Sequence, residues 1–357
     1  MGPESTRIAE LVRRAFGERT LASEIVTLQG DASTRRYARA HLTGPGAPPT
    51  VIIMLLADRG VAMSSDELAV FATAPKELPY VNVHRFLAGI GVAVPELYLD
   101  ASEEGALLLE DVGDTPLWDA AQDRADAEVV RLFEEAIDQL VLLQIAGTRQ
   151  RDDVCIAFRQ SFDRRLFEWE FEHFIEWGLV KRSPRPVPDG ELAVLRDHFG
   201  ALSDWLDRQP RVLNHRDFHA WNLFVDRGRI RVIDFQDALL APAPYDLATL
   251  LGDRDTPGLI RPDLERRLLA HYASAWTAHG GTPWRADDLW EVYATCALQK
   301  AFKVVGRFHY LDLEKGKPGY LRYIPPTLRQ IARLLAMRLD LAEVRAILGR
   351  YFPEIRP

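Results

Sequence analysis

Residues 215–222 read HRDFHAWN, and the segment RVIDFQD at 231–237 follows shortly afterwards. Together they supply two carboxylates and one carboxamide, those of Asp217, Asp234 and Asn222. Phosphoryl transfer from a nucleotide needs a carboxylate that accepts the proton of the acceptor hydroxyl, and it needs oxygen ligands that hold magnesium ions. The spacing therefore predicts that Asp217 is the catalytic base and that Asn222 and Asp234 bind the metal.

Short apolar runs flank the octet and predict strands on either side of a loop. The runs are VLN at 212–214 and LFV at 223–225, and the alternating RIRVIDF begins at residue 229. The intervening Asp226, Arg227 and Gly228 are typical of a hairpin turn. The three polar side chains are thus expected on a loop and at a strand end, where rigid elements can aim them. A chance match of the short motif is the alternative, and the flanking segments weigh against it.

The size and composition of the chain are those of an ordinary globular protein with two structural units. It has 357 residues, 47% hydrophobic and 27% charged, which is more than a single core usually supports. The formal net charge of −8 argues against a nucleic-acid partner, because such proteins usually have a basic face. No apolar run approaches the ~18 residues of a membrane span, and MGPESTRIAE lacks the apolar segment of a signal peptide. We therefore expect a cytoplasmic protein with no membrane or nucleic-acid partner.

The sequence pattern changes along the chain. The first part contains a helical pattern at 5–16, strand-like runs at 23–28, 35–42 and 50–56, a helical pattern at 78–90, and strand-like runs at 94–100 and 106–110. From residue 115 onward, apolar residues at three- and four-residue steps predict long helices, among them 127–147 and 161–178. The predicted fold is α+β and protein-kinase-like, in two lobes. They are a β-rich nucleotide-binding lobe at 1–109, a hinge at 110–113 and a larger, mostly helical catalytic and acceptor-binding lobe at 114–357.

The expected nucleotide site lies in the first lobe and at the hinge. QGDAST at 29–34 separates two strand-like runs, where backbone amides of small residues can approach phosphate oxygens. Gly30, Ser33 and Thr34 are the candidates there, and an ordinary hairpin is the competing interpretation. At the hinge, the backbones of Glu110 and Val112 could pair with adenine. The expected cofactors are ATP and Mg²⁺.

A lysine is missing from the third expected strand. TVIIMLL at 50–56 carries Met54 and aliphatic residues where kinases place a lysine that pairs with phosphate oxygens. Arg35 and Arg36 at the start of the neighbouring strand are the nearest cations. Because successive strand residues face opposite sides, only one of them should point toward the nucleotide. We favour Arg36, and the alternative is that both are surface charges.

These motifs resemble those of the aminoglycoside phosphotransferase and choline kinase superfamily. The shared landmarks are HxDxxxxN, the IDF strand at 233–235 and PYDLATL at 244–250. The resemblance implies that His215 and Asp246 are structural residues that fix the catalytic loop. The short segment between Asp234 and Asp246 leaves no room for the long activation loop of a protein kinase, so a small-molecule acceptor is expected.

A closer similarity is to the anomeric sugar kinases of bacterial cell-wall recycling, which phosphorylate N-acetylmuramate and N-acetylglucosamine at C1. That group carries loops like DASTRRYAR at 31–39 and IDFQDA at 233–238, and a C-terminal pattern like that of Gln299, Lys303, Gly316, Lys317, Tyr320, Leu321 and Pro325. The similarity covers most of the chain and implies ATP-dependent phosphorylation of an amino sugar in peptidoglycan recycling. Ala301 and Phe302 stand where the group usually has more polar residues, and they leave the preferred sugar open.

The acceptor hydroxyl has to reach Asp217 in line with the terminal phosphate, so its pocket is expected around the catalytic loop. The candidate acceptor-binding residues are Asp237, Glu168, Glu172, Trp177 and Lys303. A carboxylate beside an aromatic ring can bind sugar hydroxyls, and a lysine can meet the lactyl carboxylate of N-acetylmuramate. The competing interpretations are a turn cap for Asp237 and a solvated, ion-paired helix face for the others, since Arg164 lies four residues before Glu168.

Three functions remain open at this point. The leading one is an ATP-dependent sugar 1-kinase. The second is an aminoglycoside or other small-molecule phosphotransferase, although a polycationic antibiotic requires a densely acidic pocket and the candidate segments mix acidic, aromatic and basic residues. The third is a nucleotide-binding pseudokinase. The absent strand lysine favours this third function, and the retention of Asp217, Asn222 and Asp234 argues against it. The sequence carries no indication of an oligomeric state.

Overall fold

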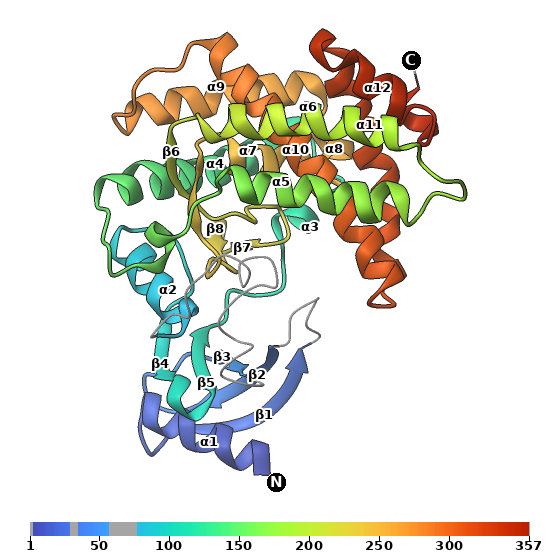
Figure 1. Cartoon of the computed structure of the whole chain (residues 1–357). Helices are drawn as coiled ribbons and strands as arrows, with labels where there is room; N and C mark the ends of the chain where they lie inside the picture. The colour runs from blue at the N-terminus through green and yellow to red at the C-terminus, as the bar shows by residue number, and fades with distance from the viewer. Residues whose placement is uncertain (1–2, 29–34, 57–76, 357) are drawn as a thin grey trace.

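The structure is a computed structural model of the chain, and it describes residues 3–28, 35–56 and 77–356. A β-sheet with one helix on its outer side forms the N-terminal part, and the remainder is mostly helical (Figure 1). This is the α+β, protein-kinase-like arrangement that the sequence predicts. The exact limits of the two lobes, 1–109 and 114–357, stay a prediction.

The N-terminal sheet has five antiparallel strands in the order β1-β2-β3-β5-β4. Their bounds are β1 (Leu21–Leu28), β2 (Arg36–Thr43), β3 (Thr50–Leu55), β4 (Leu97–Ala101) and β5 (Ala106–Glu110). Helix α1 (Pro3–Phe16) packs on one face of the sheet, and α2 (Pro79–Gly89) lies toward the helical part (Figure 1). The expected strands and both expected helices are confirmed.

The position of strand β3 inside the sheet explains its apolar sequence. It lies between β2 and β5, and side chains of successive residues point to opposite faces. Val51 and Ile53 pack with α1, whereas Met54 belongs to the large core that continues into the helical part. Both faces of this strand are therefore buried. The hydrophobic side chain of Met54 lies on the strand where kinases place a lysine.

Long helices make up most of the remaining chain. They are α3 (Leu117–Ala121), α4 (Asp126–Arg149), α5 (Arg164–His173), α6 (Asp189–Asp207), α7 (Tyr245–Gly252), α8 (Thr256–Leu259), α9 (Pro262–Ala278), α10 (Ala286–Leu313), α11 (Ile324–Ala336) and α12 (Ala342–Leu348). Short 3₁₀ helices are η3 (Ser102–Glu104), η4 (Ile156–Arg159), η6 (Pro318–Tyr323), η7 (Leu339–Leu341) and η8 (Pro353–Ile355), and the π-helix η5 (Phe174–Val180) continues α5. Helix α10 packs against α5, η5, α7 and α11. It is therefore buried on most of its circumference.

Two short strand pairs carry the segments that decide the fold. Strand β6 (Arg211–Asn214) pairs with β9 (Leu239–Pro242), and β7 (Leu223–Asp226) pairs with β8 (Arg229–Val232). The turn between β7 and β8 has positive φ at Arg227 (49°) and Gly228 (77°), as a two-residue type I′ hairpin requires. The predicted hairpin is confirmed. The octet spans the connection from β6 to β7, and Asp234 follows β8.

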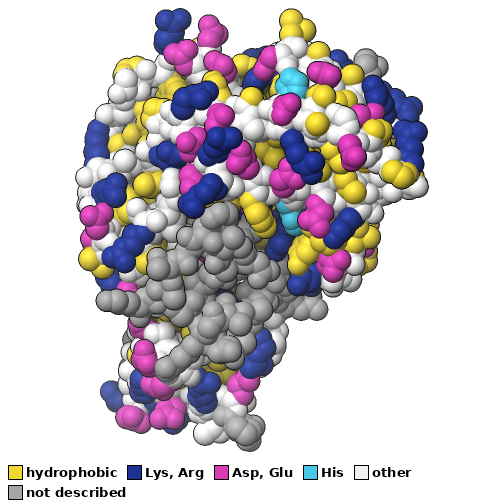
Figure 2. Space-filling model, in the orientation of Figure 1, with side chains coloured by type: hydrophobic (Ala, Val, Ile, Leu, Met, Phe, Trp, Pro, Cys, Tyr) yellow, Lys and Arg dark blue, Asp and Glu magenta, His cyan; other side chains and the backbone are white. Residues whose placement is uncertain are grey.

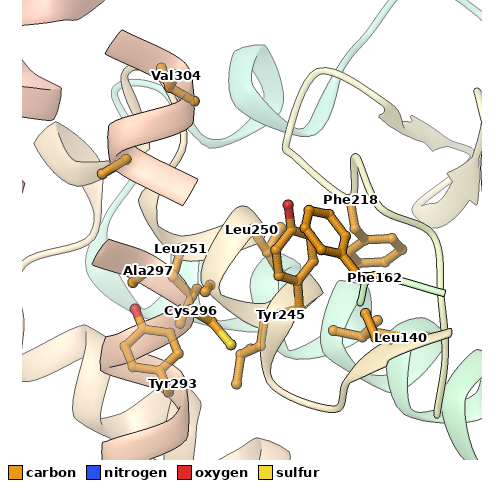
Figure 3. Packing of buried hydrophobic residues seen from close by; sticks show 14 of the residues in the cluster. Leu140, Phe162, Phe218, Tyr245, Leu250, Leu251, Tyr293, Cys296, Ala297 and Val304 are labelled. Atoms are coloured by element: carbon orange, nitrogen blue, oxygen red, sulfur yellow. The ribbon is translucent and has the colours of Figure 1, made fainter. Parts of the chain in front are cut away.

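A hydrophobic cluster anchors the octet to the helices. Figure 3 shows the ring of Tyr245, from α7, beside the rings of Phe162 and Phe218. The centroids of the Phe162 and Tyr245 rings are 4.8 Å apart, and all three side chains are fully buried. Because Phe218 directly follows Asp217, this packing holds the catalytic loop against the core.

The surface of the helical part carries charged side chains of both signs. Basic and acidic side chains are interspersed over the helical part on the face shown in Figure 2. Within the ranges that the structure describes, every helix is too short or too polar to cross a membrane.

Candidate active site

The backbone of the octet is held in an unusual conformation. Arg216 has φ of 82°, which costs a non-glycine residue on the order of 1–3 kcal/mol and persists only where neighbours enforce it. The buried carboxylate of Asp246 accepts hydrogen bonds from the backbone N–H groups of His215 and Arg216 (3.0 Å for Arg216). Asp246 therefore fixes the loop just before Asp217.

His215 ties the octet to the second segment. Its Nε2 atom lies 2.8 Å from the carbonyl oxygen of Ile233, the residue before Asp234. The side chain is fully buried, and burial lowers the pKa of His215. A neutral imidazole that donates from Nε2 fits this contact, so His215 links the backbone of the two polar segments.

The structure brings Asp217, Asn222 and Asp234 together. The Asn222 side-chain amide donates to the backbone carbonyl of Asp217 at 3.0 Å, and its nitrogen lies 3.5 Å from an Asp234 carboxylate oxygen. Asp234 has φ of 62°, and its other carboxylate oxygen accepts a hydrogen bond from Gln236 at 2.9 Å. The strand pairs thus place one carboxamide between two aspartates.

The oxygen atoms at this position suit a magnesium ion. The Asn222 amide nitrogen is used inside the loop, so its oxygen and the Asp234 carboxylate are the groups available to a cation. Both are hard oxygen donors, which Mg²⁺ prefers. In the described ranges, no cluster of three or more His, Cys, Asp or Glu side chains could hold a metal. Proteins usually hold Mg²⁺ through one or two carboxylates together with substrate phosphates.

Lys300 of α10 is a site residue that the sequence reasoning missed. Its Nζ atom lies 3.0 Å from Oδ1 of Asp217 and 3.2 Å from the carbonyl oxygen of Arg216. The residue is 4% exposed, and lysine is almost never buried without a partner. A signal was present in the sequence, because Lys300 and Lys303 interrupt an otherwise apolar stretch of helix.

The charges around Asp217 favour its ionised form. Burial opposes ionisation, but Lys300 and Lys303 outweigh it and hold the pKa of Asp217 well below its usual range. About a third (33%) of the Asp217 side chain remains exposed. The carboxylate is therefore ionised, anchored on one side and accessible on the other.

Asp237 joins the same group of carboxylates. Burial, reinforced by the charges of Asp234 and Asp217, raises the pKa of Asp237 to about 6, although Arg216 and Arg35 act in the opposite direction. Its position just before β9 brings it close to the three central residues. The carboxylate is therefore an acceptor of hydrogen bonds above about pH 6, and it gains a proton that it can donate below this pH.

Two expected acceptor residues lie on an ion-paired surface. Glu168 accepts a hydrogen bond from Arg164 at 2.9 Å, and Glu172 one from Arg196 at 2.8 Å. This is the arrangement of the competing interpretation, a solvated helix face. The inward-facing acid of α5 is Glu170, because side chains two positions apart on a helix point in different directions. The expectation that Glu168 and Glu172 bind the acceptor stays a prediction, and these ion pairs weigh against it.

Glu170 is fully buried and pairs with α10. It accepts a hydrogen bond from Gln299 at 2.7 Å and lies 3.4 Å from Nζ of Lys303. Lys303 follows Lys300 by about one turn of α10. Its charge acts on Asp217. The structure therefore places this expected acceptor residue beside the catalytic loop.

Trp177 lies in η5 and is 7% exposed. Its ring packs edge-on against Tyr310 of α10, with the centroids 5.0 Å apart, and Nζ of Lys181 lies 3.4 Å from the centre of the Trp177 ring. Most of its surface is therefore covered by protein. A ring buried in this way offers little face on which a sugar could stack.

The cation near the expected phosphate site is Arg35. Arg36 forms a salt bridge with Glu4 of α1 at 2.9 Å, with 60% of its side chain exposed. Arg35, on the opposite side of the strand, hydrogen-bonds Tyr37, and its charge acts on Asp237. The preference for Arg36 stays a prediction, and its salt bridge with Glu4 on the α1 side of the sheet weighs against it.

The hinge candidates are held by arginines from both sides. Arg231 of β8 forms a salt bridge with the Glu110 carboxylate, and the Glu110 N–H donates to the carbonyl of Glu96 at 2.8 Å. Arg39 of β2 bonds Asp111 at 2.6 Å and Asp114 at 2.7 Å. Val112 lies between these anchors and is buried. Gly30, Ser33 and Thr34 lie outside the described residues.

Comparison with known proteins agrees with this geometry. Residues 24–286 match the phosphotransferase enzyme family. The chain is 29% identical to the N-acetylmuramate/N-acetylglucosamine kinase of Pseudomonas aeruginosa over 329 residues, which are 92% of this chain and 88% of that protein. It is 30% identical to the protein of the same name from Pseudomonas putida over 342 residues, which are 94% of this chain and 90% of that protein.

A solved structure shares the fold. The choline kinase LicA of Streptococcus pneumoniae aligns with a TM-score of 0.58 at 15% identity, and the alignment covers 93% of this chain and 100% of that one. At this identity the likeness shows the kinase-like fold alone. The resemblance to aminoglycoside phosphotransferases and choline kinases, and to the amino-sugar kinases among them, is confirmed. Because the family match spans most of its length, the chain is a phosphotransferase that belongs to the phosphotransferase enzyme family.

Proposed function

We propose that this protein is an ATP-dependent sugar kinase that transfers the γ-phosphate to the C1 hydroxyl of N-acetylmuramate, N-acetylglucosamine or both. The observation that carries the proposal is the position of the Asn222 amide between Asp217 and Asp234. The names of the two bacterial relatives support the choice of sugar. Such a reaction belongs to peptidoglycan recycling and to the cytoplasm, where ATP is available.

In the proposed reaction, Asp217 acts on the acceptor. Its carboxylate orients the sugar hydroxyl and accepts the hydroxyl proton as the oxygen attacks the γ-phosphorus. A bond forms between the acceptor oxygen and phosphorus, and the bond from phosphorus to the bridging oxygen of ADP breaks. The products are the sugar phosphate, ADP and a proton on Asp217 that passes to solvent.

Asn222 and Asp234 would hold Mg²⁺ in this reaction. The ion, when bound, neutralises the charge on the phosphates. The side chains themselves are positioned by the loop, since Asn222 is fixed by its hydrogen bond to the backbone of Asp217. They therefore present their oxygens in a preset arrangement.

The nucleotide site of the proposal extends from the sheet to the hinge. We favour Arg35, which directly precedes β2, over Arg36 as the cation that faces the phosphates. In this proposal Glu110 and Val112 contribute backbone groups for adenine, and Gly30, Ser33 and Thr34 stay the phosphate-binding candidates that the sequence predicts. The anchoring of the hinge by Arg39 and Arg231 supports a fixed position for the adenine contacts.

The electrostatics of the base support an anomeric acceptor. A carboxylate that cations hold ionised is a weak proton acceptor, and such a base works best on an acidic hydroxyl. The hemiacetal hydroxyl at C1 ionises more readily than the other sugar hydroxyls. Asp237 is suited to bind sugar hydroxyls or the acetamido group, and Lys303 is the candidate for a lactyl carboxylate. The cations near Asp217 disfavour a polycationic antibiotic.

The test is an acceptor panel with Mg²⁺ and ATP. Purified protein is incubated with N-acetylmuramate, N-acetylglucosamine, other hexoses, choline and kanamycin, and ADP release is compared for the wild type and Asp217→Asn. We expect release with the two N-acetylated sugars, and a loss of about 10²–10⁴ in turnover for the variant, the usual range for a positioned proton acceptor. Release with kanamycin or choline alone would support the alternative phosphotransferase function. No release with any acceptor would support a pseudokinase.

A further inference from the structure

Lys300 makes two contacts with the catalytic loop. Its Nζ atom is within 3.2 Å of the Arg216 carbonyl and within 3.0 Å of the Asp217 carboxylate. The lysine is nearly fully buried, and it reaches the loop from α10, far along the chain. One ammonium group therefore holds a peptide carbonyl and the adjoining side chain at the same time.

The peptide that Lys300 holds is the strained one. Arg216 has φ of 82°, and its N–H donates to Asp246 at 3.0 Å. Asp246 thus accepts a hydrogen bond from the N–H of Arg216, and Lys300 donates one to the Arg216 carbonyl group. A conformation of this kind persists where several contacts enforce it, and the two contacts together set the direction in which Asp217 leaves the backbone.

Asp217 is the carboxylate in salt-bridge contact with Lys300, and the Lys300 charge also acts on the buried Asp246. The neighbouring Lys303 is paired with the buried Glu170, which also accepts a hydrogen bond from Gln299. The Tyr245 ring, whose centroid is 5.5 Å from Nζ of Lys300, covers another side of the ammonium group. Helix α10 is itself fixed by α5, η5, α7 and α11, so the ammonium group has little freedom to move.

We propose that Lys300 is a positioning residue for phosphoryl transfer, which fixes the Arg216–Asp217 peptide and one carboxylate oxygen so that the exposed side of Asp217 meets the acceptor. The inference rests on the proposed role of Asp217 as the base. Small displacements of a reacting group lower rates strongly, by about 10²-fold for a 1 Å misplacement.

The test is a double-mutant cycle in kcat with Lys300→Met, Asp217→Asn and the double variant. Lys300→Met should lower kcat by about 10²-fold and leave the KM for ATP within about threefold, because the residue acts on the base and not on the nucleotide. In the Asp217→Asn background the same substitution should change kcat by less than about threefold, since residues that act as a unit are strongly non-additive. Lys300→Arg should restore part of the lost kcat, because it keeps the charge.

Arg333→Met is the control for the loss of a cation that pairs with a buried carboxylate. Arg333 pairs with Glu265 at 2.7 Å within the helical core, and Glu265 is also bonded to Tyr293. The control should lower the melting temperature and leave kcat of the folded enzyme unchanged. If Lys300→Met does not fold, Lys300→Gln and Lys300→Arg complete the same cycle.

Two results would overturn the proposal. One is an equal loss of kcat from Lys300→Met in the wild-type and Asp217→Asn backgrounds, and the other is a wild-type kcat in a folded Lys300→Met protein. The cycle is measured with whichever acceptor the panel identifies or, failing any, as ATP hydrolysis with water as acceptor. The proposal for Lys300 and the proposal for the sugar can therefore fail separately.

Discussion

The side-chain nitrogen of Asn222 lies 3.5 Å from a carboxylate oxygen of Asp234, although the two residues belong to different strand connections. The β7–β8 hairpin creates this relationship, because it returns the chain from the end of the octet to Asp234. The same hairpin places Ile233 against His215. A short, two-residue turn therefore fixes the spacing of the proposed metal ligands.

Removal of one metal ligand should separate metal binding from nucleotide binding. We predict that Asp234→Asn lowers kcat at least about 10²-fold, because phosphoryl transfer depends on charge neutralisation at the phosphates. Calorimetry should show that the variant binds ADP without Mg²⁺ as the wild type does, and that added Mg²⁺ no longer strengthens binding. If Mg²⁺ strengthens ADP binding by the variant as much as by the wild type, Asp234 is not a metal ligand.

The two neighbouring arginines of the first sheet provide a matched pair. Arg35→Ala should raise the KM for ATP about tenfold or more, consistent with the loss of a charged hydrogen bond worth about 1.5–3 kcal/mol. Arg36→Ala removes the same charge but only a surface salt bridge with Glu4, which contributes about 0–1 kcal/mol. Its KM for ATP should be that of the wild type. A KM for ATP that rises in Arg36→Ala and is unchanged in Arg35→Ala would identify Arg36 as the phosphate-binding cation.

Asp246 should matter for stability more than its distance from the chemistry suggests. Asp246→Ala leaves the N–H groups of His215 and Arg216 without their acceptor, at about 1–3 kcal/mol for each buried group. We expect a lower free energy of unfolding in urea and a low kcat. Asp246→Asn keeps one acceptor oxygen, so its free energy of unfolding and its kcat should lie between those of the wild type and Asp246→Ala. An unfolding free energy equal to that of the wild type in both variants would show that other contacts hold the loop.

The sugar affinity should depend on pH through Asp237. Its pKa is raised to about 6, so the carboxylate is ionised above this pH and neutral below it. If the carboxylate accepts hydrogen bonds from the sugar, the KM for sugar rises as the pH falls through about 6. Asp237→Asn should raise the KM for sugar at pH 7.5 and remove this pH dependence. A variant that retains the wild-type dependence would exclude Asp237 as its source.

Local sequence patterns predicted the elements of the fold and the central residues of the site. The strand at 50–56, the hairpin around Arg227 and Gly228, and the meeting of Asn222 with Asp234 all follow from patterns within one or two adjacent elements. Such patterns are set by hydrophobic periodicity and turn chemistry, which single sequences report well.

The sequence did not predict the direction of several side chains, because that direction depends on how each helix or strand is rotated about its own axis. Arg35 directly precedes β2 and Arg36 is its first residue, so their side chains take different directions. Glu168 and Glu170 differ in which side of α5 they occupy. Lys300 reaches Asp217 across a large separation in sequence. Tertiary packing decides all three, and no local pattern carries that information.

The most direct test of the central claim is the ³¹P and ¹H NMR spectrum of the product from N-acetylglucosamine or N-acetylmuramate. The account predicts a phosphorus resonance coupled to the anomeric proton, with Asp217→Asn giving this signal at a strongly reduced rate. Coupling of phosphorus to a proton at any other carbon, or product formed at the wild-type rate by Asp217→Asn, would contradict it.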